Sequence, residues 1–123
     1  MRKIFILLML LNSFTTMASC EVYIPVKYFH HDSGYSINFN FEKLLAPKGY
    51  VEVENPEAPN VLFIEGEELK GRFHKALAKM SLGDLKVSAQ VICLTQLCAI
   101  SDYAKAFNKT YKIFARQLPE CHK

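Results

Sequence analysis

Four cysteines are the residues whose spacing says most about chemistry in this chain: Cys20, Cys93, Cys98 and Cys121. An even number of thiols can pair completely in an oxidising compartment. Four residues separate Cys93 from Cys98, whereas a thioredoxin-type redox pair is separated by two. The spacing therefore argues against a dithiol enzyme and favours structural disulfides.

Histidine and carboxylate side chains offer a second kind of chemistry. His30, His31 and Asp32 are consecutive, and imidazole with carboxylate suits a zinc or copper ion. Successive side chains of a strand point to opposite faces, however, so one ion would not readily bind both histidines. A solvated turn is the simpler interpretation here. His74, on the apolar side of a predicted strand, is more simply a core histidine, and His122 in the tail has no expected role.

No other pattern in the chain indicates catalysis or cofactor binding. The glycines stand singly at expected turns, so none forms a phosphate-binding loop, and neither a serine nucleophile motif nor a helical histidine pair occurs. We therefore predict no catalytic residues, no cofactor and no metal.

The most periodic segment, residues 101–118, predicts the helix that the rest of the domain packs against. Its large apolar residues recur every three or four positions and fall on one face. Ser101 is the expected N-cap, Asp102 suits the first turn, and Pro119 ends the segment. The apolar face consists of Tyr103, Phe107, Tyr111, Phe114 and Leu118, flanked by Ala104 and Ala115.

A basic stripe lies on the opposite side of this predicted helix. It consists of Lys105, Lys109, Lys112 and Arg116. The stripe could contact anionic lipid headgroups or an acidic partner, although a solvated face that keeps the protein soluble is the simpler interpretation. No aromatic residues interleave with these cations, which argues against nucleic acid as the partner.

The first nineteen residues predict a secretion signal. Arg2 and Lys3 precede an apolar run over residues 4–11, and small residues follow. The run is too short to span a bilayer, and no later segment is apolar for long enough. We expect residues 1–19 to be removed and residues 20–123 to form one domain with no transmembrane segment.

Cys20 has two interpretations that remain open. Residues 17–20 resemble a bacterial lipoprotein signal, whose cysteine becomes the lipidated first residue, although Met17 stands where that pattern prefers leucine. Alternatively, signal peptidase cuts after Ala18 or Ser19 and leaves Cys20 free to form a disulfide. Lipidation would leave three thiols, and one of them would lack a partner.

Geometry predicts which cysteines pair in the second case. A helix over residues 101–118 would hold Cys98 and Cys121 about 27 Å apart, too far for a disulfide. Cys93 and Cys98 can instead close a short loop, and Cys121 would meet Cys20 at the start of the first strand.

Alternating apolar residues predict the strands of a sheet. The first runs over residues 22–29, with Pro25 at an edge or a bulge. The alternation of Tyr35, Ile37, Phe39 and Phe41 would complete a hairpin with this strand, but a short helix over 41–46 is favoured, and residues 35–39 stay open. Further strands are expected at 51–53 and at 61–64, the latter covered on both faces and followed by a charged turn over 65–72. A hairpin over 73–93 turns at Gly83 and Asp84.

These elements predict an α+β fold with an antiparallel sheet of about four or five strands. One long C-terminal amphipathic helix packs on one face, and a short helix follows the first strand. The function expected first is a small exported protein of non-enzymatic, interaction or structural type. It would be periplasmic, secreted or lipid-anchored in a bacterial envelope, with another envelope protein or an anionic membrane surface as its partner. The alternative is a small secreted hydrolase or metal-binding protein that uses His30, His31, Asp32 and His74.

Overall fold

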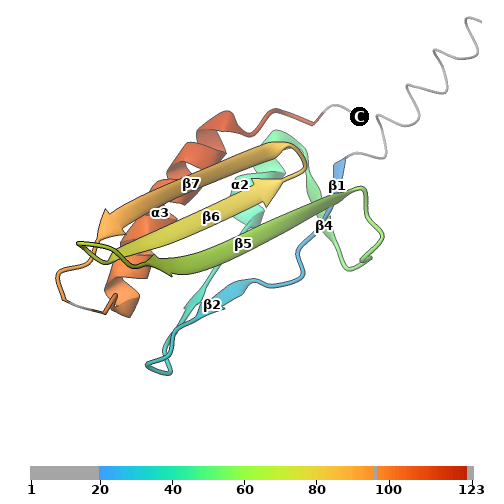
Figure 1. Cartoon of the computed structure of the whole chain (residues 1–123). Helices are drawn as coiled ribbons and strands as arrows, with labels where there is room; N and C mark the ends of the chain where they lie inside the picture. The colour runs from blue at the N-terminus through green and yellow to red at the C-terminus, as the bar shows by residue number, and fades with distance from the viewer. Residues whose placement is uncertain (1–19, 96, 122–123) are drawn as a thin grey trace, which may run out of the picture.

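The computed structural model describes residues 20–95 and 97–121 and has the predicted α+β architecture. Five strands form one sheet in the order β4-β1-β5-β6-β7 (Figure 1). Strands β5, β6 and β7 are antiparallel, as expected, but β1 runs parallel to both β4 and β5. The sheet is therefore mixed. The strands of this sheet are β1 (Glu21–Tyr23), β4 (Val51–Val53), β5 (Asn60–Leu69), β6 (Lys75–Leu82) and β7 (Leu85–Ile92).

Helix α3 (Ile100–Gln117) covers one face of this sheet, lying across β6 and β7 (Figure 1). The predicted apolar face is confirmed, because Tyr103, Phe107, Phe114 and Leu118 are buried and Tyr111 is half-buried. The predicted N-cap is wrong. The helix begins one residue before Ser101, and the backbone N–H of the N-cap residue Ala99 donates to Asp102 Oδ2 at 2.8 Å.

The first predicted strand is broken in two around Pro25. Its second part, β2 (Tyr28–His30), leaves the main sheet and pairs with β3 (Ser36–Asn38) in a separate two-stranded hairpin. The Phe29 ring of this hairpin lies over Gly66 of β5, where a Cβ atom would stand 2.4 Å from Phe29 Cε1. The same ring packs against Tyr103, with 4.7 Å between ring centroids. A glycine in β5 thus makes room for the hairpin to pack between sheet and helix.

The predicted short helix is present as α2 (Glu42–Leu45), which continues into the 3-10 turn η2 (Ala46–Lys48). Leu44 and Leu45 are buried in the main core. Gly49 ends the segment in the left-handed conformation, with a φ of 85°. This conformation favours glycine, which carries no Cβ.

Strand β5 is longer and more open than the sequence predicts. It continues through the residues expected to form a charged turn, with Glu65 and Glu67 exposed and Gly66 and Glu68 on the helix side. The expectation that residues 61–64 are covered on both faces is also wrong, because Phe63 is 54 % exposed. The hairpin of β6 and β7 is confirmed, and its turn has Gly83 at a φ of 58°.

Two disulfides hold the two ends of the sheet, and they are the pairs that geometry predicts. Cys20 is bonded to Cys121 and Cys93 to Cys98, with Cα–Cα distances of 5.7 and 5.2 Å. The Cys121 backbone N–H also donates to the Lys48 carbonyl at 2.7 Å. Because β5 runs ten residues between these regions, the two bridges lie roughly 33 Å apart along the strand direction.

Candidate functional site

Large apolar side chains are exposed together where β7 ends and the Cys93–Cys98 loop begins. Leu94 is 92 % exposed and Leu97 is 69 % exposed, while Phe73 and Ile92 are each 59 % exposed. The register of β6 and β7 pairs Lys75 with Ile92, and continuing it places Phe73 level with Leu94. We call these four residues, Phe73, Ile92, Leu94 and Leu97, the apolar tip. In Figure 1 the two segments that carry them lie side by side at one end of the sheet.

The loop that carries Leu94 and Leu97 is held in place at both of its cysteines. The Cys93 backbone N–H donates to the His74 carbonyl at 2.8 Å, which extends the β6–β7 ladder. The Cys98 backbone N–H donates to Glu68 Oε1 at 2.7 Å. His31 Nε2 lies 2.9 Å from the Cys98 carbonyl oxygen. Together with the disulfide, these bonds fix both ends of a loop whose two leucines point into solvent.

The tautomer of His31 follows from its partners. The Ser33 backbone N–H donates to Nδ1 at 3.1 Å, so Nδ1 carries no proton. Nε2 is then protonated and donates to the Cys98 carbonyl. The imidazole therefore connects the β2–β3 hairpin to the disulfide loop, and its ring lies 5.5 Å from that of Tyr103.

Glu68 is the carboxylate that bonds to both the Cys98 backbone N–H and the His74 side chain. Its second oxygen, Oε2, lies 3.2 Å from His74 Nδ1. The hydrogen bond from the Cys98 backbone N–H holds the pKa of the Glu68 carboxyl below its ordinary value, and the bond from His74 acts in the same direction. Glu68 is therefore a charged acceptor that holds the disulfide loop through Oε1 and the His74 side chain through Oε2.

A pocket of about 500 Å³ lies between the loop, β5 and the β2–β3 hairpin. Its lining includes His30, His31, Asp32, Glu68 and Tyr103. Burial raises the pKa of the Tyr103 hydroxyl, and the carboxylates of Glu68, Asp32 and Asp102 add to the effect. The phenol therefore stays protonated at neutral pH.

The histidines that the sequence suggested as metal ligands do not form a metal site. His30 Nδ1 lies 3.0 Å from Ser36 Oγ, and His31 and His74 are engaged as described above. Across residues 20–95 and 97–121, no group of three or more histidine, cysteine or acidic side chains could hold a metal ion. His122 lies outside the described residues.

Three cations lie near Phe73 along the chain, in the β5–β6 turn and at the first residue of β6. Lys70, Arg72 and Lys75 lie within six residues of one another, and the Arg72 guanidinium lies over the Phe73 ring at 5.9 Å from its centroid. The predicted basic stripe on α3 is a different surface. Its four cations, Lys105, Lys109, Lys112 and Arg116, are all exposed on the outer side of the helix.

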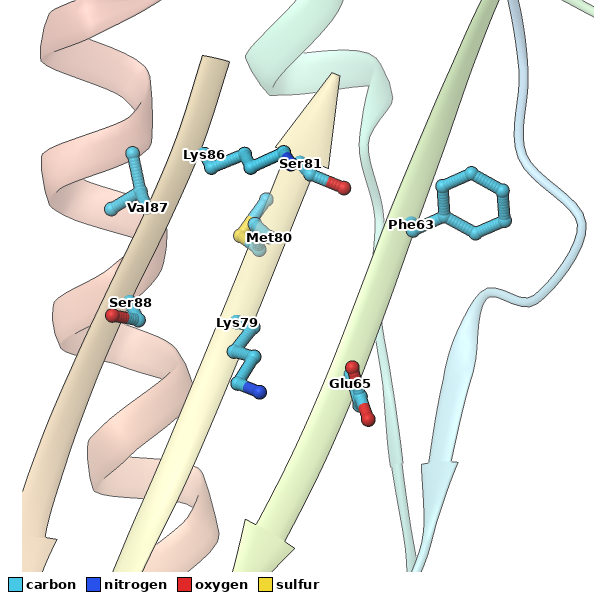
Figure 2. Close-up of a pocket in the computed structure, with 8 residues that line it drawn as sticks. All are labelled: Phe63, Glu65, Lys79, Met80, Ser81, Lys86, Val87 and Ser88. Atoms are coloured by element: carbon cyan, nitrogen blue, oxygen red, sulfur yellow. The ribbon is translucent and has the colours of Figure 1, made fainter. Parts of the chain in front are cut away.

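A second pocket, of about 300 Å³, lies on β5, β6 and β7 (Figure 2). Phe63, Glu65 and Lys79 contribute to it from strand positions that alternate away from the core. Lys79 Nζ forms an ion pair with Glu67 Oε2 at 3.2 Å on the same face. This face is mixed in charge and carries a single strongly exposed aromatic ring in the pocket, so it is a weaker candidate than the tip.

Sequence reasoning missed the residues that make up this site. Glu68 was assigned to a charged turn, and Leu94 and Leu97 were regarded only as the interior of a disulfide loop. A signal was present, because two leucines enclosed by paired cysteines cannot both turn inward in so short a loop. Within the described part of the chain, no helix is long and apolar enough to cross a membrane. Comparison with protein families, curated proteins and solved structures finds no match to the chain.

Proposed function

We propose that this chain is a small exported protein of non-enzymatic type, secreted or periplasmic in a bacterium, which binds another component through its apolar tip. The observation that carries this proposal is the exposure of Leu94 and Leu97 on a braced loop. Clustered exposed apolar side chains are typical of binding sites. A loop whose two ends are already held loses less conformational entropy when it binds.

Two features support export. Residues 1–19 have the charge and apolar pattern of a secretion signal, and the two disulfides suit an oxidising compartment. The Cys20–Cys121 bond also favours cleavage without lipidation, because a sulfur bonded to Cys121 cannot carry a lipid thioether. A lipid-anchored form would require Cys121 to lack this bridge.

The export part of the proposal is tested by intact mass spectrometry of the full-length gene product expressed in a bacterium. We expect the periplasmic or secreted fraction to contain a chain that begins at Ser19 or Cys20. Four cysteines should react with an alkylating agent only after reduction. An added acyl mass, or a chain that retains residues 1–19 in the cytosol with reactive thiols, would contradict the proposal.

The binding part is tested with a photocrosslinking amino acid at position 94. The matched control places the same amino acid at Val51, which is exposed on the edge strand β4 and pairs with Glu21 at the far end of the sheet. We expect irradiation of whole cells to give adducts, to protein or lipid, from position 94 and not from position 51. Equal labelling from both positions, or none from position 94, would refute the tip as the binding surface.

A further inference from the structure

We infer that the apolar tip binds the surface of an anionic phospholipid membrane, with Leu94 and Leu97 in the acyl-chain boundary and the neighbouring cations at the phosphate level. The inference rests on the proposed function and deepens it, because it names the partner of the same surface. Three observations carry it: the protrusion of the leucines, the local charge, and the anchoring of both ends of the loop.

The protrusion of the leucines suits a fluid partner. Leu94 is 92 % exposed, so almost none of its side chain rests on its own domain. Phe73 and Ile92 are exposed near it at the same end of the β6–β7 hairpin. A protein partner would need a cavity shaped for each protruding side chain, whereas the membrane interface accepts leucine and phenylalanine side chains without a preformed site.

The local charge matches an anionic surface. Residues 69–75 and 92–99 contain Lys70, Arg72 and Lys75 and not one carboxylate. Three carboxylates lie behind the tip: Glu68 and Asp102 accept from the Cys98 and Ala99 N–H groups, and Asp32 lines the pocket beside Leu97. Cations beside apolar side chains are the combination that draws a protein to anionic lipid, each lysine or arginine contributing about fivefold in affinity near the membrane surface.

Both ends of the loop are held in place. The disulfide joins Cys93 to Cys98, and Glu68 and His31 bond to the Cys98 backbone, while Leu94 and Leu97 stand exposed beside these two cysteines. Among the described residues, the basic stripe on α3 has no exposed large apolar side chain beside it. Every strongly exposed large apolar residue of the described chain lies outside α3, so the stripe could attract headgroups but could not insert.

Vesicle sedimentation tests the inference with the disulfide-bonded protein purified from the exported fraction. Two vesicle compositions are compared: equal parts of phosphatidylglycerol and phosphatidylcholine, and phosphatidylcholine alone. We expect binding to the anionic vesicles, at least tenfold weaker binding to the neutral ones, and weakening as salt is raised. The variant Leu94→Asn/Leu97→Asn should bind anionic vesicles at least tenfold more weakly, because it lacks the two leucine side chains that would insert into the membrane. Both substitutions are at exposed positions, and circular dichroism checks that the fold is kept.

Tryptophan fluorescence locates the inserted segment, since the chain contains no tryptophan. The variant Leu94→Trp should shift its emission to the blue on addition of anionic vesicles. The control Val51→Trp, at the far end of the sheet, should not shift. A shift in both variants would indicate general adsorption or unfolding and would overturn the inference.

Two further results would also overturn it. If replacing the α3 stripe (Lys105, Lys109, Lys112 and Arg116) by glutamine abolishes vesicle binding while Leu94→Asn/Leu97→Asn leaves it unchanged, the helix and not the tip contacts the membrane. If the protein ignores both vesicles while the crosslinker at position 94 labels one protein in cells, the membrane inference fails and the proposed function stands.

Discussion

Removing the Cys20–Cys121 disulfide should cost more stability than removing the Cys93–Cys98 disulfide. The two bridges differ mainly in the length of chain that they close. The first joins residues 101 positions apart and the second joins residues five positions apart. A disulfide stabilises a protein largely by restricting the unfolded chain, and the restriction grows with the logarithm of the loop length. The structure therefore predicts which disulfide contributes more to stability and how large each contribution is.

The chain-entropy relation gives the magnitudes. A loop of about 100 residues corresponds to about 4.7 kcal/mol, and a loop of about five residues corresponds to about 2 kcal/mol. The variants Cys20→Ala/Cys121→Ala and Cys93→Ala/Cys98→Ala replace the same atoms, and Cys20, Cys93 and Cys98 are all buried. Packing losses should therefore be similar. The difference between the variants, about 2.7 kcal/mol, is better determined than either loss alone.

Urea unfolding of the oxidised protein and both variants, followed by circular dichroism, measures these losses. The long-bridge variant should also show a larger m-value, because its unfolded chain exposes more surface. Equal losses of stability in the two variants, or a larger loss in the short-bridge variant, would refute the dependence on loop length. Leu94→Asn/Leu97→Asn is a control that should leave the free energy of unfolding within about 0.5 kcal/mol of the parent.

Three other perturbations test the packing and the bracing of the loop. Gly66→Ala should cost about 1–3 kcal/mol in urea unfolding, because the new methyl group overlaps the Phe29 ring; a loss below about 0.5 kcal/mol would mean that the ring moves aside freely. Thr110→Val should cost about 1 kcal/mol in the same assay, since the single proton of the fully buried hydroxyl is shared between the Ala106 carbonyl oxygen at 2.9 Å and the Ala78 carbonyl oxygen of β6 at 3.0 Å, and a neutral effect would contradict that role. The pKa of Glu68 is lowered in the folded protein, so its unfolded form takes up a proton first as pH falls. Its stabilisation is complete above the unfolded pKa and disappears as pH falls through the folded pKa. The protection factor of the Cys98 amide in hydrogen exchange, which corrects for the intrinsic pH dependence of the rate, should fall over that range, and in Glu68→Gln it should not change there.

The parts of the fold that local pattern determines were predictable. The spacing of Tyr103, Phe107, Phe114 and Leu118 indicates a helix because apolar residues that recur with a 3.6-residue period line up only on a helical face. Glycine at position 83 between two alternating segments likewise indicates a hairpin. The length of the helix excluded a bond between Cys98 and Cys121, and the short loop between the strand end at Cys93 and the start of the helix then selected Cys93–Cys98 and Cys20–Cys121.

The features that depend on distant partners were not predictable from pattern. The parallel placement of β1 between β4 and β5 depends on pairings that no local period encodes. The charged residues Glu65 and Glu67 suggested a turn, because strand propensities are too weak and context-dependent to identify a strand there. Glu68 turns toward the helix side, where the Cys98 N–H needs an acceptor, and only the assembled fold brings these two groups together.

The bond between Cys20 and Cys121 closes the main chain of residues 20–121 into a covalent ring. A protease that cuts one peptide bond of this ring opens it without releasing a fragment. The nicked molecule keeps all its segments covalently linked, and its strands can pair again. Two cuts are needed before any piece can leave. Outside the cell, where cleavage is frequent and no new chain can be made, such a molecule would outlast one whose ends were free.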